Sequence, residues 1–166
     1  MKIHNVLFLC TGNSARSILA EAILNKDGAG RFYAYSAGSH PKEQVNPTAM
    51  KLLGELGYPL EDLKPESWDD FAVPGAPQLD FVFTLCDDAA GEICPAWPGQ
   101  PISAHWGIPD PAAVEGDGQA KAFWETYCVL KRWIDIFLNL PLESIDSMSL
   151  RTKLREIGRT SDQDVA

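Results

Sequence analysis

Cys10 and Arg16 are the residues of this sequence whose types and spacing best suit chemistry on an anion. Small residues fill the gap between them, and an apolar run, Val6–Leu9, leads directly into the cysteine. Gly12 and Asn13 tolerate left-handed backbone angles, which turn successive N–H groups inward. Such a loop, followed by a helix N-terminus, binds anions. We expect a tetrahedral oxyanion to be held above Cys10 by residues of one loop, Thr11, Gly12, Asn13, Ser14, Ala15, Arg16 and Ser17.

The same surroundings favour Cys10 as a nucleophile. A helix N-terminus and a nearby guanidinium stabilise a thiolate, and the Ser17 hydroxyl could donate a hydrogen bond to the sulfur. The planar fork of Arg16 can bind two oxygens of the anion at once. The alternative is a buried cysteine that lies near an arginine by chance, but strand, loop and helix follow one another in register here.

Two further cysteines, Cys86 and Cys94, flank a short acidic segment of small residues. Cys86 closes a predicted strand, so we expect it at the same sheet edge as Cys10. Two such thiols suit a relay in which a disulfide forms and is passed outward by exchange. Two other interpretations remain, a pair of unrelated small apolar residues and a metal site that lacks further ligands. Cys128 lies in a predicted helix and is interpreted as structural.

Asp110 is the best-placed acid for such chemistry. It lies between Pro109 and Pro111, in a stiff loop that follows a predicted strand. Displacement of an oxygen by Cys10 needs a proton donor, which a carboxylic acid can supply. Alternatively, Asp110 simply forms a turn. His105 is given no chemical role.

These residues require a scaffold of alternating strands and helices. Apolar runs predict strands at Asn5–Cys10, Arg31–Ala37, Phe81–Leu85 and Pro101–Ala104. Helical periodicity predicts helices at Ser14–Asn25, Asn46–Leu56 and Gln119–Leu138. The region Pro59–Gln78 is predicted to be a surface connection with a short helix. The alternation indicates an α/β protein with a parallel sheet, which places ligands at the carboxyl ends of its strands.

Length and net charge exclude some classes of function. The chain has 166 residues and a net charge of −9, which indicates one main domain and argues against sequence-independent nucleic-acid binding. Met1-Lys2-Ile3 leads straight into the first strand, and no apolar run is long enough for a bilayer, so we expect neither a signal peptide nor membrane association. The four cysteines are then cytoplasmic thiols. We predict a main domain at 1–140 and a C-terminal appendage at 141–166, with a short helix packed through Leu150, Leu154 and Ile157 or serving as a docking tail.

The sequence resembles the low-molecular-weight protein tyrosine phosphatase superfamily, and within it the thioredoxin-coupled arsenate reductases. The resemblance is carried by Cys10–Ser17, Ser36–Ser39, the pair Cys86 and Cys94, and His105–Pro111, and it spans about residues 3 to 140. It implies a three-layer α/β sandwich with a four-stranded parallel sheet, related to flavodoxin. The tyrosine phosphatases usually have aromatic residues after the Asp-Pro pair, whereas this chain has Ala112-Ala113.

The resemblance further implies a mechanism with three thiols. Cys10 attacks arsenate while Asp110 protonates the leaving oxygen, and Cys86 then attacks Cys10, which releases arsenite. Cys94 attacks Cys86, and the resulting disulfide is reduced by thioredoxin, with glutaredoxin as a less favoured reductant. Phosphate is expected to compete with arsenate.

Some relatives also bind a potassium ion through side chains that match Asn13, Glu21 and Ser36, although these residues could equally brace the loop. We expect an external thiol reductant, no tightly bound cofactor and a monomer. The alternatives are a phosphatase acting on phosphoesters and a non-enzymatic redox or anion sensor.

Overall fold

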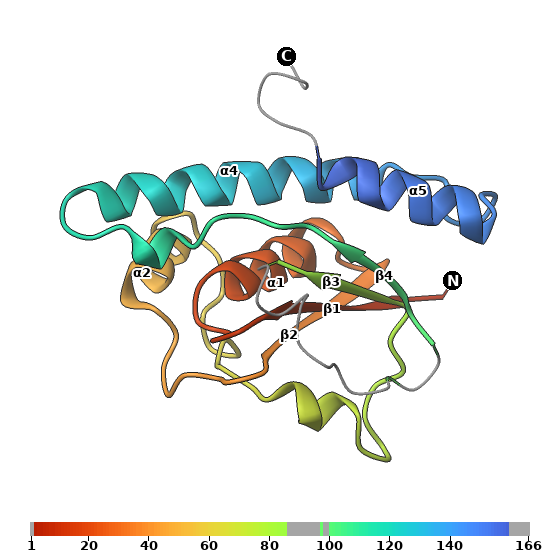
Figure 1. The fold of residues 1–166 in the computed structure, drawn as a ribbon, viewed down its shortest axis with the longest axis horizontal. Helices are drawn as coiled ribbons and strands as arrows, with labels where there is room; N and C mark the ends of the chain where they lie inside the picture. Colours follow the sequence, from red (N-terminus) through yellow and green to blue (C-terminus); the bar gives the residue numbers. More distant parts are fainter. Residues whose placement is uncertain (1, 86–96, 98–99, 160–166) are drawn as a thin grey trace.

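A four-stranded parallel sheet forms the centre of the computed structural model, which describes residues 2–85, 97 and 100–159 (Figure 1). The strands are β1 (His4–Cys10), β2 (Phe32–Gly38), β3 (Phe81–Thr84) and β4 (Ile102–His105), in the order β2-β1-β3-β4. Cys10 pairs with Gly38, and Thr84 pairs with His105. The carboxyl ends of the strands therefore meet at one edge, as the sequence predicts.

The helices follow the predicted order. They are α1 (Arg16–Asp27), α2 (Pro47–Glu55), α4 (Gly118–Leu138) and α5 (Ser147–Ile157), with short 3-10 helices η1 (Trp68–Phe71) and η2 (Pro111–Ala113). The start of α2 shows why the prediction succeeds. Asn46 accepts a hydrogen bond from the Thr48 amide and Pro47 occupies the first helical position, both of which favour helix initiation.

Alternate side chains of β1 point to opposite faces of the sheet, and each face has its own cover. Val6 and Phe8 belong to the cluster formed with α1, α4 and α5, whereas Leu7 and Leu9 belong to a second cluster. The second cluster includes Trp68 and Phe71, which are 8% and 4% exposed. Helices, sheet and the η1 region thus make three layers, which confirms the predicted sandwich (Figure 1).

The η1 region departs from the prediction in one respect. The sequence of Pro59–Gln78 is rich in proline and acidic residues, which predicts a surface connection. The short helix is present, but its Trp68 and Phe71 are buried against the sheet. The physical reason is that β1 is apolar on both faces, and the face away from α1 also needs a cover.

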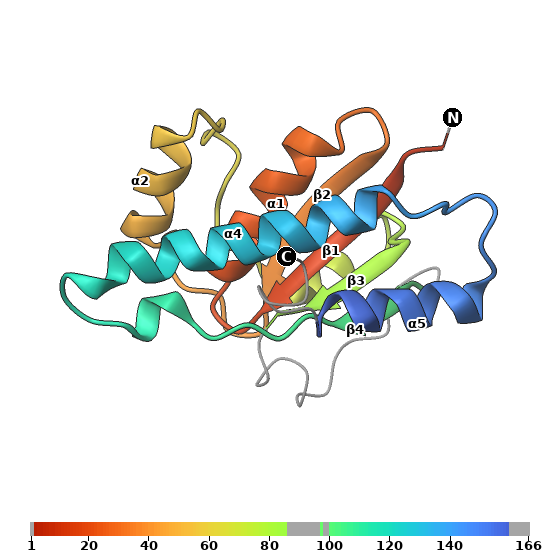
Figure 2. The ribbon, with the colours of Figure 1, turned by 90° about the horizontal axis from the view of Figure 1, so that it is seen from above.

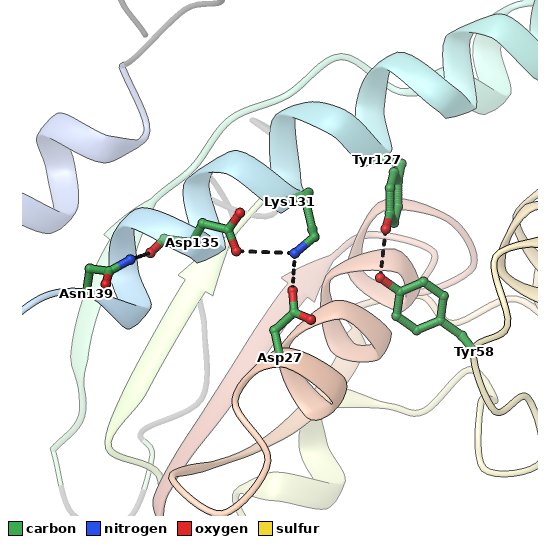
Figure 3. Close-up of polar contacts among 6 residues, drawn as sticks. All are labelled: Asp27, Tyr58, Tyr127, Lys131, Asp135 and Asn139. Carbon is green, nitrogen blue, oxygen red and sulfur yellow. Dashed lines mark hydrogen bonds and ion pairs between the residues drawn. The ribbon is translucent and has the colours of Figure 1, made fainter.

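Polar contacts hold α4 against its neighbours (Figure 3). The Lys131 ammonium lies between the carboxylates of Asp27 on α1 and Asp135 on α4, and the hydrogen bond to Asp27 is the main cause that raises the pKa of Lys131. The hydroxyls of Tyr58 and Tyr127 are 2.7 Å apart. These contacts lie on the helical side of the molecule.

The last helix, α5, packs on the edge strand β4 (Figure 2). Its apolar side chains Leu150, Leu154 and Ile157 are buried in the same cluster as α1 and α4, and the Trp106 indole donates a 2.9 Å hydrogen bond to the Leu154 carbonyl. The short helix is therefore packed on the body, whereas the predicted division at residue 140 stays a prediction. None of the helices described here is both long and apolar enough to cross a bilayer.

Candidate active site

Cys10 is the last residue of β1, and its side chain is 4% exposed. The turn into α1 occupies residues 11–15, and α1 begins at Arg16. Asn13 adopts the left-handed conformation, with φ of 47°, whereas Gly12 is not among the residues with positive φ. A single left-handed residue is therefore sufficient to reverse the chain here.

The backbone carbonyls of this loop are hydrogen-bonded to the segment that follows β2. The amides of His40, Lys42 and Asn46 donate to the carbonyls of Thr11, Gly12 and Ser14, at 2.9, 2.9 and 2.8 Å. These carbonyl groups are thus fixed on the side of residues 40–46. Carbonyl oxygens repel an anion. Because these oxygens are held toward residues 40–46, they do not oppose an anion bound on the other side of the loop.

Gly38 permits the close contact between β2 and the loop. A Cβ atom at this position would lie 2.5 Å from the Thr11 carbonyl oxygen and 3.0 Å from the Asn13 amide nitrogen. Any side chain larger than hydrogen would therefore displace the loop from its present position.

Asn13 and Ser17 brace the loop from within. Asn13 is fully buried; its side-chain amide donates a 2.8 Å hydrogen bond to the Ser17 hydroxyl and its oxygen accepts one of 2.7 Å from the Glu66 amide. The Ser17 hydroxyl accepts this bond and keeps its own proton for donation. Its predicted bond to the sulfur of Cys10 stays a prediction.

Arg16 is held from the opposite side of the site. One terminal nitrogen donates a 3.0 Å hydrogen bond to the Ile108 carbonyl, and the other lies 3.8 Å from the Asp110 carboxylate. Its Nε is buried and has no hydrogen-bond partner among the described residues. A buried N–H without an acceptor is costly, and a bound oxyanion would supply that acceptor.

Asp110 forms a turn and also faces the arginine of the site. One carboxylate oxygen accepts a 2.9 Å hydrogen bond from the Ala112 amide, which caps η2, while the other faces Arg16. The side chain is 40% exposed, so it can exchange protons with solvent. Turn formation therefore places this acid beside the arginine.

Cys86 and Cys94 lie outside the described residues. The Leu85 amide donates a 2.9 Å hydrogen bond to the Leu9 carbonyl. The residue that precedes Cys86 therefore lies beside the strand end that carries Cys10, although the roles of both thiols stay predictions. Cys128 is half-buried on α4 and packs against the main cluster, in keeping with a structural role.

A cavity of about 1190 Å³ extends from the carboxyl edge of the sheet along β3 and β4. At the carboxyl edge its walls include residues from the loop, the strand ends and the end of α5 with the turn after it, namely Arg16, Thr84, His105, Asp110, Arg155 and Arg159. Arg155 and Arg159 were not predicted to lie at this edge. The signal available was the basic composition of residues 151–159, but its position follows only from the packing of α5 on β4.

Glu21 on α1 and Ser36 on β2 form a buried pair. The Ser36 hydroxyl donates a 2.7 Å hydrogen bond to the Glu21 carboxylate, and burial raises the pKa of Glu21 to about 7.

No cluster of three or more His, Cys, Asp or Glu side chains that could hold a metal occurs in the described part of the chain. The oxygens of Asn13, Glu21 and Ser36 are the hard ligands that a potassium ion prefers, and a cation would offset the buried carboxylate.

Comparisons with known proteins agree with this geometry. Residues 5–147 match the family described as low molecular weight phosphotyrosine protein phosphatase. An arsenate reductase of Halalkalibacterium halodurans is 39% identical over 116 residues, which cover 70% of this chain and 80% of that protein.

Solved structures give the same assignment of the fold. An arsenate reductase in the phosphate binding state has a TM-score of 0.67 and 28% identity, and the match covers 82% of this chain and 97% of that one. A thioredoxin-dependent arsenate reductase of Corynebacterium glutamicum has a TM-score of 0.58 and 24% identity, over 83% of this chain and 64% of that one. Arsenate reductases are thus among the relatives of this chain, which itself belongs to the low molecular weight phosphotyrosine protein phosphatase family.

Proposed function

We propose that this protein reduces arsenate to arsenite, with Cys10 as the nucleophile. The observation that carries the proposal is the buried Nε of Arg16, which has no acceptor among the described residues and lies at the loop that begins at Cys10. The similarity to arsenate reductases, at 39% identity for the H. halodurans protein, supports arsenate as the oxyanion.

The first step is a displacement at arsenic. The Cys10 thiolate forms a sulfur–arsenic bond, and one arsenic–oxygen bond breaks as Asp110 gives its proton to the leaving oxygen, which departs as water. Loop amides and Arg16 hold the remaining oxygens. The 3.8 Å distance between Arg16 and Asp110 leaves the acid close to the anion.

The second step transfers two electrons. Cys86 attacks the sulfur of Cys10, a disulfide forms, and the pair of the broken sulfur–arsenic bond stays on arsenic, which leaves as arsenite. Cys94 then attacks Cys86 and releases the Cys10 thiolate. The external reductant that we propose for the Cys86–Cys94 disulfide is thioredoxin, in preference to glutaredoxin, and the printed name of the C. glutamicum protein supports this choice.

We also propose a bound cation near the loop. A potassium ion held by Asn13, Glu21 and Ser36 would supply a positive charge that keeps Glu21 ionised and the loop braced. No other bound cofactor is proposed. We further propose a cytoplasmic monomer, in which phosphate competes with arsenate at the loop.

Phosphoester hydrolysis is the second candidate function, because it needs the same Cys10, Arg16 and Asp110. The residues after Asp110 argue against an aryl substrate. Ala112 and Ala113 form η2, so these two positions offer no aromatic side chain to a phosphotyrosine ring.

The two functions separate in one experiment. Arsenate-dependent NADPH oxidation would be followed with thioredoxin and thioredoxin reductase for the wild type, Cys86→Ser, Cys94→Ser and the control Cys128→Ser. We expect turnover to be lost in the first two variants and retained in the control. Absence of wild-type turnover with any thiol reductant, together with aryl phosphate hydrolysis that survives Cys86→Ser, would instead establish a phosphatase.

A further inference from the structure

The basic face of α5 contrasts with the charge of the chain as a whole. Residues 150–159 carry four cationic side chains and one carboxylate, within a sequence whose net charge is −9. Three of the four cations, Arg151, Arg155 and Arg159, are spaced four residues apart and are exposed. Arg151 and Arg155 are neighbours on one face of α5, and Arg159 follows in the turn just after the helix, where its amide donates a 3.1 Å hydrogen bond to the Glu156 carbonyl. We call these three residues the α5 arginine row.

The row leads to the candidate active site. Arg155 and Arg159 line the same cavity as Arg16, and among the described residues that line it Asp110 is the only one with a carboxylate. In the described ranges, no ion pair neutralises any arginine of the row. The positive field at the cavity edge is therefore available to a partner.

The row is fixed in place by the buried side of α5. Leu150, Leu154 and Ile157 anchor the helix in the core. Gly158 approaches β4 so closely that a Cβ atom there would lie 2.8 Å from the His105 carbonyl oxygen and 2.7 Å from a Trp106 ring carbon. Because the backbone of α5 is already ordered, binding to the row costs only the rotamer freedom of the arginine side chains and no ordering of the chain itself.

The length of the row decides what it fits. Arg159 lies eight residues after Arg151, in the turn that follows α5, so the row extends over about 12 Å at a helical rise per residue. One small oxyanion can contact only one end of such a row, and the Cys10 loop already provides its binding groups. An acidic protein surface can contact the whole row at once, and opposite charges speed its association.

We infer that the α5 arginine row docks the protein that reduces this enzyme, through carboxylates that lie near the reducing thiols of that partner. The inference rests on the proposed function, and its placement rests on Leu85, which precedes Cys86: the Leu85 amide donates to the Leu9 carbonyl, and Leu9 lines the same cavity as Arg155. The favourable effect of basic residues on the C-terminal end of a helix would account for Arg155 but not for a row that continues from Arg151.

The test is a charge reversal, with Arg151→Glu, Arg155→Glu and Arg159→Glu combined. The matched control combines Lys51→Glu, Lys64→Glu and Lys121→Glu, which changes the net charge equally at exposed residues outside the cavity. The readouts are the KM for thioredoxin in arsenate-dependent NADPH oxidation and the turnover with dithiothreitol, a small dithiol. A third variant with glutamine at 151, 155 and 159 removes the charge without reversing it, and thermal unfolding shows whether each variant is folded.

We expect the KM for thioredoxin to rise about tenfold or more in the reversed variant and about threefold in the glutamine variant. The control and the turnover with dithiothreitol should change less than about twofold. An unchanged KM for thioredoxin in folded variants, or an equal rise in the control, would overturn the inference. An equal loss with dithiothreitol would also overturn it, because α5 would then serve the chemistry. Failure of the wild type with every reductant would refute the proposed function itself.

Discussion

Two positively charged regions line one cavity, and they differ in the groups that supply the charge. In the Cys10 loop (residues 10–17), charge comes from backbone dipoles and the nearly buried Arg16, whose side chain is 12% exposed. In the α5 arginine row, charge comes from exposed side chains on a helix anchored by apolar contacts. The loop holds an anion at fixed atoms, whereas the row provides a field that salt screens. The loop should therefore be sensitive to small changes in shape, and the row only to changes in charge.

The largest effect should come from replacing Arg16 by lysine. Lysine keeps the charge but cannot bind two oxygens in the plane of a fork. It also cannot keep the 3.0 Å bond to the Ile108 carbonyl while facing the anion. We expect kcat/KM for arsenate to fall about 10²- to 10³-fold.

Arg31→Lys is the matched control, because Arg31 donates to the Leu138 carbonyl on the exposed surface, away from the site. Steady-state kinetics of both variants would show the difference. Equal activity of Arg16→Lys and the wild type would remove the reason to regard the loop as a geometric site.

Gly38→Ala tests the shape of the loop without changing any charge. The new Cβ would clash with the Thr11 carbonyl oxygen, at 2.5 Å, and we expect a loss of about 1–3 kcal/mol in the free energy of unfolding. Arsenate affinity should fall as well, because the loop must move. Urea unfolding and the KM for arsenate measure the two effects.

Gly54→Ala is a control with the opposite expectation. Gly54 lies within α2, and its Cβ would meet only Leu60, at 3.5 Å. Alanine favours a helix by about 1 kcal/mol over glycine. If both variants lost the same stability, the contact between Gly38 and the loop would not be the cause.

Glu21 provides a prediction of pH dependence. Its pKa is raised from 4.5 to about 7 by burial, so between these values the folded protein holds a proton that the unfolded chain has released. The carboxyl's contribution to stability is present below pH 4.5 and declines as the pH rises to 7, by on the order of 3 kcal/mol. Glu21→Gln cannot ionise, and its free energy of unfolding should not show this decline.

The measurement is urea unfolding at pH 5 and pH 8 in choline chloride, with Glu55→Gln as an exposed control. Addition of potassium chloride at pH 8 should restore stability to the wild type and not to Glu21→Gln. If potassium and choline gave the same stability for the wild type, the proposed cation would be refuted.

The smallest effect should come from salt alone. Exposed charges are screened at about 8–10 Å near physiological ionic strength. Between about 20 and 200 mM sodium chloride, we expect the KM for thioredoxin to rise about threefold. The KM for arsenate should change less, because the Arg16 side chain is largely buried. Equal changes in both KM values would erase the distinction between the two regions.

Much of the site was predictable because its main parts are contiguous. Strand, loop and helix occupy residues 4–27 without interruption, and short-range rules therefore placed Cys10 under the loop. The position of Asp110 at the carboxyl edge was predictable as well, since a strand precedes it and parallel strands share that edge, whereas its role as the acid stays a prediction. The role of residues 59–78 was only partly predicted. The acidic, proline-rich composition of this region is typical of exposed segments. It gave no indication that Trp68 and Phe71 of η1 are buried against the sheet.

The sequence by itself determined the local chemistry: a cysteine and an arginine on one loop, an asparagine that tolerates the left-handed conformation, and an acid held by two prolines. Only the tertiary structure decided which distant groups meet them. Arg16 reaches the Ile108 carbonyl 92 residues away, and α5 brings Arg155 and Arg159 to the cavity. The reason is that a local motif is set by backbone conformation over a few residues. Contacts between distant segments depend on the strand order β2-β1-β3-β4 and on which apolar faces pack together.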